Sequence, residues 1–194
     1  MSDQTDKGLL DAYARGDERS FTLLMERYGR SLKGYAFRLL KNQEQAEEVC
    51  SETFLRLAIH KRRLDGKEAS VRSYIFTIAH NLCMDLFRRQ RTQRMHAENI
   101  LELTLTQQSI PSPEAVAIMG ERAAMLEAAI SRLSEEHRQV ILLRSTHGFS
   151  AKEAASIIGI DSHQVDSLLS YAKKKLRVEL ASLDREIKEQ GGLG

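Results

Sequence analysis

The sequence predicts an all-α protein made of two small helical domains joined by a flexible linker. Apolar residues recur at spacings of three and four along almost the whole chain, which is the period of amphipathic helices. Strand signals are weak, because aromatic residues make up only 6% of the chain and apolar and polar residues rarely alternate. Of the 194 residues, 42% are hydrophobic and 29% charged, which is enough to pack cores rather than remain disordered.

The N-terminal half contains three strongly amphipathic segments. Residues 20–40 place apolar and aromatic side chains along one stripe, namely Phe21, Leu24, Tyr28, Leu32, Tyr35 and Leu39. Residues 42–61 do the same with Ala46, Val49, Cys50, Phe54 and Leu57. Residues 70–91 form a third such segment, after the polar stretch 62–70. Stripes of this kind are typical of helices that pack into a core.

The helical pattern weakens between Thr92 and Pro113. Pro111 and Pro113 cannot lie inside a helix, and each favours an extended conformation of the residue before it. We therefore expect one domain at 1–91, a linker at 92–113 and a second domain at 114–194. Further helices are expected from about 114 to 132 and from the N-cap Ser134 to 148.

Residues 150–177 carry the pattern of a helix-turn-helix. Ser150 and Glu153 form a capping box, Gly159 supplies a tight turn, and Asp161 is the expected N-cap of the second helix. The buried stripe of that second helix is then Val165, Leu169, Ala172 and Leu176. In a helix-turn-helix the second helix enters the major groove of DNA. A helical hairpin packed for other reasons is the alternative.

The sequence predicts no cofactor, no metal and no enzymatic activity. Cys50 and Cys83 have no metal-ligand spacing, and we expect two reduced thiols. There is no phosphate-binding loop and no nucleophile–base motif. No run of about 18 apolar residues and no signal peptide are present. We therefore expect a cytoplasmic protein without membrane insertion.

Positive charge is concentrated in one region, although the net charge is only +2. Ten Lys and Arg stand against three acidic residues between Arg56 and Arg94. A cationic surface that carries an aromatic side chain binds single strands through phosphates and stacking, which contributes ~1–3 kcal/mol per base. The region therefore indicates nucleic-acid binding.

Both halves of the chain resemble one family, the extracytoplasmic-function sigma factors of bacterial RNA polymerase. The stretch "RLSEEHRQVILLRSTHGFSAKEAASIIGIDSHQVDSLLSYAKKKLR" looks like region 4, which reads the promoter −35 element. The stretches "GDERSFTLLMERYG", "QAEEVCSETFLRL" and "SYIFTIAHNLCMDLFRR" are similar to region 2. The resemblance, over about residues 9–180, implies binding to the β′ and β subunits of core polymerase and to promoter DNA. It also implies control by an anti-sigma factor.

The resemblance also implies individual contacts. For polymerase binding these are Glu47, Glu48, Glu52, Arg56 and Leu57. A loop at 62–71 and the following helix capture the −10 element as unpaired bases. The contacts implied there are Arg62, Arg63, Lys67, Tyr74, His80, Asn81, Arg88 and Arg89. Asp85 is expected to pair with a neighbouring Arg. For the −35 element they are Ser162, His163, Gln164, Ser167, Tyr171, Lys173 and Lys174.

Three residues depart from the family pattern in the second helix of the helix-turn-helix. Asp166, Leu168 and Tyr171 stand where the family commonly has Lys, Arg and Arg. Each phosphate-binding cation contributes ~0.9 to the salt dependence of duplex binding, so we expect weak or altered reading of the −35 element.

Two alternatives remain at this point. The departures in region 4 favour a sigma-like decoy, which would bind an anti-sigma partner without reading promoters. A free-standing helix-turn-helix repressor is the other alternative, but it leaves residues 9–91 unexplained.

Overall fold

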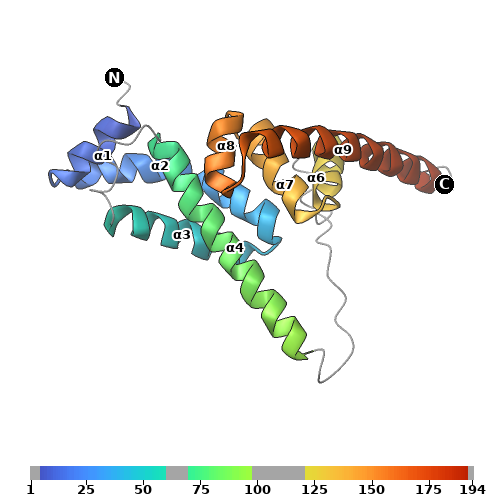
Figure 1. Ribbon diagram of the computed structural model, residues 1–194, viewed down its shortest axis with the longest axis horizontal. Coiled ribbons are helices and arrows are strands. Elements are labelled where there is room, and N and C mark those ends of the chain that lie inside the picture. The colour runs from blue at the N-terminus through green and yellow to red at the C-terminus, as the bar shows by residue number, and fades with distance from the viewer. Residues whose placement is uncertain (1–4, 60–69, 98–120, 192–194) are drawn as a thin grey trace. The chain divides into compact units, whose positions relative to one another are not determined.

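The computed structural model describes residues 5–59, 70–97 and 121–191. In these ranges every regular element is a helix, as the sequence predicted. The chain divides into two compact units, and the main division falls inside the segment 98–120 (Figure 1). Among the described residues, no helix is both long enough and apolar enough to cross a bilayer.

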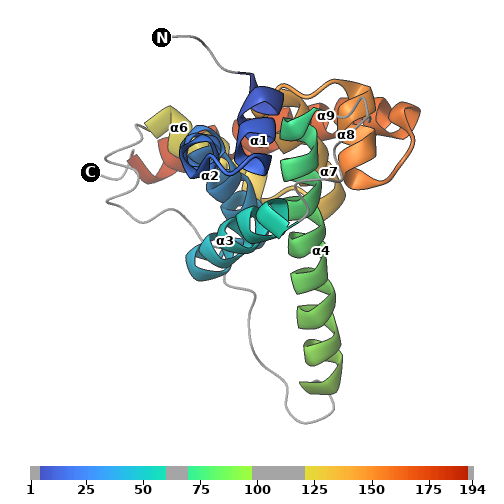
Figure 2. The same cartoon turned by 90° about the vertical axis from the view of Figure 1, so that its left-hand side faces the viewer.

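The N-terminal unit consists of α1 (Asp6–Ala14), α2 (Glu18–Leu40), α3 (Gln43–Ile59) and α4 (Val71–Ala97). Helices α2, α3 and α4 pack against one another, and α1 packs on α2 (Figure 2). Leu24, Leu32 and Tyr35 of α2 are fully buried with Leu57 of α3 and Phe76 of α4. The predicted stripes of the three helices therefore form one core. Burial of each leucine side chain in it stabilises the fold by ~1.5–3 kcal/mol.

The turn between α2 and α3 is built from local capping interactions. Helix α2 ends at Leu40, and its C-cap Lys41 adopts a left-handed conformation with φ of 55°. Asn42 follows, and its Oδ1 accepts a hydrogen bond of 2.9 Å from the backbone N–H of Gln45. Asn is a favoured N-cap because its side chain satisfies an N–H at the start of a helix. The direction of α3, which carries the predicted polymerase contacts, is therefore set by this turn.

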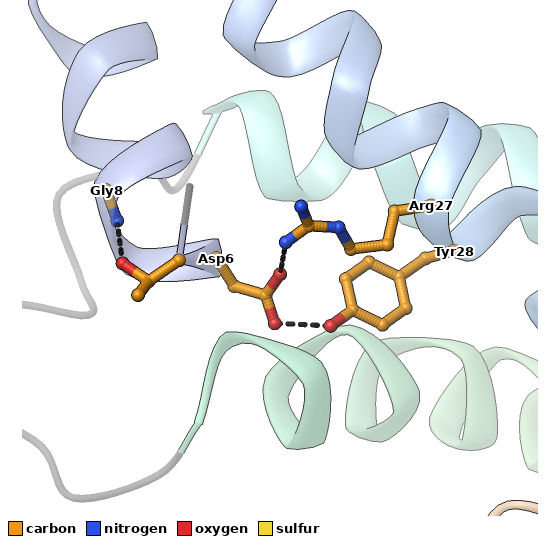
Figure 3. A network of polar contacts seen from close by, with 5 residues as sticks. Asp6, Gly8, Arg27 and Tyr28 are labelled. Atoms are coloured by element: carbon orange, nitrogen blue, oxygen red, sulfur yellow. Dashed lines mark hydrogen bonds and ion pairs between the residues drawn. The ribbon is translucent and has the colours of Figure 1, made fainter. Parts of the chain in front are cut away.

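Helix α1 is fixed to α2 by the carboxylate of Asp6 (Figure 3). One oxygen of Asp6 lies 2.5 Å from Nη1 of Arg27, and the other accepts a hydrogen bond from the hydroxyl of Tyr28. Burial of Tyr28, together with this bond to Asp6, raises the pKa of its phenol. Thr5 caps α1 by accepting a 3.1 Å bond from the N–H of Gly8.

The C-terminal unit consists of α6 (Glu121–Ser131), α7 (Glu135–Ile141), the π-helix η2 (Leu142–Thr146), α8 (Ala151–Ile158) and α9 (Ser162–Gly191). Both α6 and α7 pack against α9. Buried Arg138 of α7 closes the turn after α6, since its Nη2 donates to the carbonyls of Ser131 and Leu133 at 2.9 and 2.8 Å. Such bonds satisfy the carbonyls that a helix leaves free at its C-terminus.

The helix-turn-helix is confirmed in detail. Ser150 and Glu153 form both bonds of the capping box. Gly159 ends α8 with φ of 82°, a conformation that other residues adopt only at a cost. Asp161 accepts a 2.7 Å bond from the N–H of His163 at the start of α9. The predicted stripe of α9 faces inward, with Val165, Leu169 and Ala172 buried and Leu176 half-buried.

Two helices differ from the sequence-based expectation. Helix α4 continues to Ala97, so residues 92–97 are helical although we expected the linker to begin at 92. This stretch has no Pro or Gly and contains good helix formers, which explains the extension. The expected helix from Ser134 to 148 changes after Ile141 into η2, whose wider turn brings the His147 N–H to the Leu142 carbonyl at 2.9 Å.

Candidate polymerase-binding and nucleic-acid-binding surfaces

The outer face of α3 is charged and partly organised by its own ion pairs. Glu52 and Arg56 lie one turn apart and form an ion pair of 2.7 Å. Glu47 accepts bonds from Gln43 at 2.6 Å and from Lys33 at 3.4 Å, which together lower the pKa of its exposed carboxyl. Glu48 is exposed beside them. Glu48, Glu52 and Arg56 therefore share an accessible face of α3, while Glu47 lies on the side of the helix toward Lys33 of α2.

The prediction of Leu57 as a polymerase contact is wrong, because its side chain is 0% exposed in the core of the N-terminal unit. Sequence reasoning missed Leu55 and Ile59, which are 55% and 66% exposed on the same helix. Leu55 borders a groove of about 410 Å³ between α3 and α4, whose other apolar lining includes Leu82 and Leu86 of α4. Glu48, Glu52 and Arg56 line the same groove. The available signal was spacing, since Leu55 and Ile59 lie outside the buried stripe of α3.

Helix α4 presents a polar face suited to contact with an unpaired strand. Asn81, Arg88 and Arg89 are exposed, and Tyr74 is half-buried about two turns before Asn81. Spacings of seven residues return to one side of a helix, so Tyr74, Asn81 and Arg88 share a face. Asp85 pairs with Arg88 at 2.5 Å, as expected. This face offers an aromatic ring, an amide and cations in a row.

The prediction of His80 as a DNA contact is wrong. His80 is only 2% exposed, and its Nδ1 is hydrogen-bonded to the buried hydroxyl of Tyr35 at 2.9 Å. Burial lowers the pKa of this imidazole to about 4 and raises that of the neighbouring Cys83 thiol to about 12. His80 therefore belongs to the core. The other three predicted −10 contacts, Arg62, Arg63 and Lys67, lie outside the described residues.

The first turns of α9 present the predicted −35 contacts. His163, Gln164 and Ser167 are exposed, and Ser162 is half-buried at the first position of the helix. The Oε1 of Gln164 accepts a 3.1 Å bond from the N–H of Asp161, so this side chain takes part in capping α9. The second lone pair of Oε1 and the Nε2 amide of Gln164 remain available for a base edge.

Two of the three departures from the family pattern make contacts within the C-terminal unit. Nη2 of Arg144 in η2 lies 3.7 Å from Oδ1 of Asp166. The ring of Tyr171 stacks on that of His137 in α7, with centroids 4.8 Å apart, yet its side chain remains 52% exposed. Leu168 is half-buried. Asp166 and Tyr171 therefore connect α9 to η2 and α7 while their side chains remain exposed.

Cations lie further along the same side of α9. Lys173, Lys174 and Arg177 are exposed and line a shallow hollow with Ser167, Ser170, Tyr171 and Asp166. Hydroxyl, lysine and arginine groups are those that most often bind DNA phosphates. Within the described ranges, no group of three or more His, Cys, Asp or Glu is arranged to hold a metal ion. Cys50 and Cys83 are free thiols.

Comparison with known proteins identifies both units. Residues 24–93 match the Sigma-70 region 2 family and residues 123–176 match the Sigma-70, region 4 family. The protein is thus a two-domain transcription initiation factor of the sigma-70 class. The ECF RNA polymerase sigma factor SigL of Mycobacterium tuberculosis is 31% identical over 160 residues, which cover 82% of this chain and 88% of SigL. The chain belongs to the extracytoplasmic-function sigma factors, which bind core RNA polymerase, direct it to promoters and are not enzymes.

Other relatives and solved structures agree. The ECF RNA polymerase sigma factor SigX of Bacillus subtilis is 25% identical over 174 residues, 88% of each chain. The structure of CnrH in complex with the cytosolic domain of CnrY has a TM-score of 0.66 at 24% identity, covering 91% of this chain and 97% of CnrH. That of the sigma factor RpoE with the anti-sigma factor NepR from Bartonella quintana has a TM-score of 0.66 at 18% identity, covering 84% and 98%. These likenesses show the fold.

Proposed function

We propose that this sigma factor acts in the cytoplasm, under the control of an anti-sigma factor, through three surfaces. The α3 face binds polymerase, the α4 face binds the −10 element, and the first turns of α9 bind the −35 element. The N-terminal domain extends to the end of α4 at Ala97 rather than to 91, and the C-terminal domain extends over 114–194. The observation that carries this proposal is the row of Tyr74, Asn81 and Arg88 along one side of α4.

The α4 row supports binding of an unpaired strand. The Tyr74 ring can stack on a base, and base–aromatic stacking contributes ~1–3 kcal/mol. The Asn81 amide has both a donor and an acceptor for a base edge. Arg88 and Arg89 supply charge for phosphates, although Arg88 shares its charge with Asp85. A base leaves the stack at least cost where the strand is already open, which is the situation at the −10 element.

The α3 face supports polymerase docking. Glu47, Glu48 and Glu52 provide negative charge, and the ion pair of Glu52 with Arg56 holds two of the side chains in place. Exposed Leu55, at the edge of the groove between α3 and α4, adds apolar area beside these charges. An apolar centre with a charged rim is the usual composition of a protein–protein interface.

Control by an anti-sigma factor is supported by relatives of the same fold. RpoE was solved with the anti-sigma factor NepR, and CnrH with the cytosolic domain of CnrY. By analogy, we expect a partner that covers one or more of the three surfaces and thereby prevents initiation.

Run-off transcription on fragmented genomic DNA tests the assignment of surfaces. Core polymerase with the full chain should yield discrete transcripts that core polymerase alone does not. The double variant Tyr74→Ala, Asn81→Ala should reduce their yield by at least about tenfold, since it removes one stacking contact and one base contact. Its co-sedimentation with polymerase should stay unchanged. Glu48→Lys should instead weaken co-sedimentation. Glu26→Lys, a charge reversal at an exposed position of α2, is the matched control.

The outcomes separate the alternatives. Unchanged transcription by the Tyr74 and Asn81 double variant would refute the −10 surface. Binding to polymerase without any new transcript would favour the decoy interpretation, in which the chain occupies partners but does not initiate.

A further inference from the structure

Asp166 occupies a position from which a helix-turn-helix reads bases. It lies in the second turn of α9, and its side chain is 61% exposed. Val165 and Leu169, on the adjoining side of the helix, are buried, so Asp166 lies at the edge of the exposed face of α9. In helix-turn-helix proteins the N-terminal residues of the second helix contact base edges in the major groove. The exposed carboxylate of Asp166 is therefore within reach of base edges in the groove.

An isolated carboxylate would repel DNA, but Asp166 is not isolated. Nη2 of Arg144 lies 3.7 Å from Oδ1 of Asp166, and Nη1 of Arg144 donates a 2.6 Å bond to the carbonyl of Phe149. The second bond holds the guanidinium in place between η2 and α9. At 3.7 Å the pair interacts through charge without a hydrogen bond, so both oxygens of Asp166 keep lone pairs for a donor from outside.

Among the base edges of the major groove, cytosine fits a carboxylate best. A carboxylate only accepts hydrogen bonds, and only cytosine N4 and adenine N6 donate in this groove. Adenine places its N7 acceptor beside N6, which would repel a second carboxylate oxygen, and guanine and thymine present only acceptors. An amide side chain has both a donor and an acceptor, so it can pair with N7 and N6 of adenine.

We propose that Asp166 reads a cytosine in the −35 element, and that Arg144 is the residue that positions its carboxylate and offsets its charge. The proposal rests on the proposed use of α9 at the −35 element. The cations Lys173, Lys174 and Arg177, about two to three turns later and lining the same hollow, contact phosphate in this arrangement. Asp166 thus changes which sequence α9 reads rather than abolishing its reading.

A promoter library tests this with the complete holoenzyme. A promoter from the run-off experiment is randomised in its −35 element, its −10 element is kept, and the transcribed sequences are counted. The wild-type protein should favour cytosine about tenfold at one position, as expected for one side chain–base contact. Asp166→Asn should shift that position alone toward adenine, and Asp166→Ala should remove its preference. Asp184→Asn, which removes the same charge about 27 Å further along α9, is the matched control.

The Arg144 variants test positioning. Arg144→Lys should keep the cytosine preference in part, whereas Arg144→Met should lose it and bind all −35 sequences less well. Circular dichroism melting curves establish that each variant is folded. If Arg144→Met does not fold, the Asp166 variants still test the contact between Asp166 and cytosine.

Several results would overturn the proposal. If both Asp166 variants strengthen initiation equally on every −35 sequence, Asp166 acts only by repulsion. If the wild type selects no base at any −35 position while transcription still depends on the −10 element, α9 does not read the promoter and the −35 surface fails with it. Selection at −35 positions that neither Asp166 variant alters would refute the role of Asp166 alone.

Discussion

Acidification should destabilise the N-terminal unit through His80. The imidazole is buried against Tyr35, and burial lowers its pKa to about 4, compared with about 6.5 in an unfolded chain. Because the folded pKa lies below the unfolded one, the unfolded chain binds the proton more readily. The stability that depends on neutral His80 is therefore fully present above pH 6.5 and is lost as the pH falls toward 4.

The size of the effect follows from these two values. The full difference corresponds to about 3 kcal/mol below pH 4, at about 1.4 kcal/mol for each pH unit between them. At pH 5 the loss is about 2 kcal/mol, and at pH 7.5 it is close to zero. Since single domains are stable by only ~5–15 kcal/mol, a loss of 2 kcal/mol is readily measured.

Urea unfolding of the full chain at pH 7.5 and pH 5, followed by tyrosine fluorescence, measures this loss. The chain has no Trp, and four of its five Tyr lie in the N-terminal unit, so the signal reports mainly on that unit. His80→Gln keeps a hydrogen-bonding group near Tyr35 but does not titrate, so the loss between the two pH values should shrink by about 2 kcal/mol. His163→Gln, at an exposed position, should retain the wild-type loss. Equal losses in wild type and His80→Gln would refute the reasoning.

Three further changes have defined expected effects. Arg138→Met should destabilise the C-terminal unit by about 3 kcal/mol, because buried carbonyls at the end of α6 lose their donor. A loss of stability below about 1 kcal/mol in thermal melts followed at 222 nm would contradict this. Gly159→Ala should cost about 1–2 kcal/mol because of the left-handed backbone alone, since no atom crowds the position; Gly159→Asn, measured in parallel, should cost less. Asp6→Ala should cost about 1–2 kcal/mol through the lost bonds to Arg27 and Tyr28, and Asp11→Ala serves as its control in urea unfolding.

Local signals predicted the helix-turn-helix, whereas side-chain burial was predicted less well. The capping box at Ser150 and the turn at Gly159 depend on neighbouring residues only, so the sequence contains all the information. His80 and Asn81 are adjacent, and one faces the core while the other faces solvent. The spacing of Phe76, His80 and Cys83 by four and three residues would have placed His80 inside. For Leu57, the helical spacing predicted a buried side chain, whereas the family resemblance implied a polymerase contact.

Contacts between helices could not be predicted in this way. Arginine is rarely buried, so nothing in the local sequence indicated that Arg138 closes the turn after α6. The stacking of His137 on Tyr171 and the ion pair of Arg144 with Asp166 join residues more than 20 positions apart. The π-helix η2, which contains Arg144, has no clear sequence signature. Such contacts depend on how α7, η2 and α9 pack, which only the tertiary structure specifies.

The burial of Cys83 and the partial burial of Cys50 make this chain convenient for site-specific labelling. Burial raises the pKa of both thiols, so little thiolate is present at neutral pH, and maleimides react with the thiolate. A single Ala181→Cys change would add an exposed thiol on α9, about 22 Å along the helix from Asp166. That distance suits energy transfer to a dye on promoter DNA. The native cysteines could then remain in place while the arrival of α9 at a promoter is followed in real time.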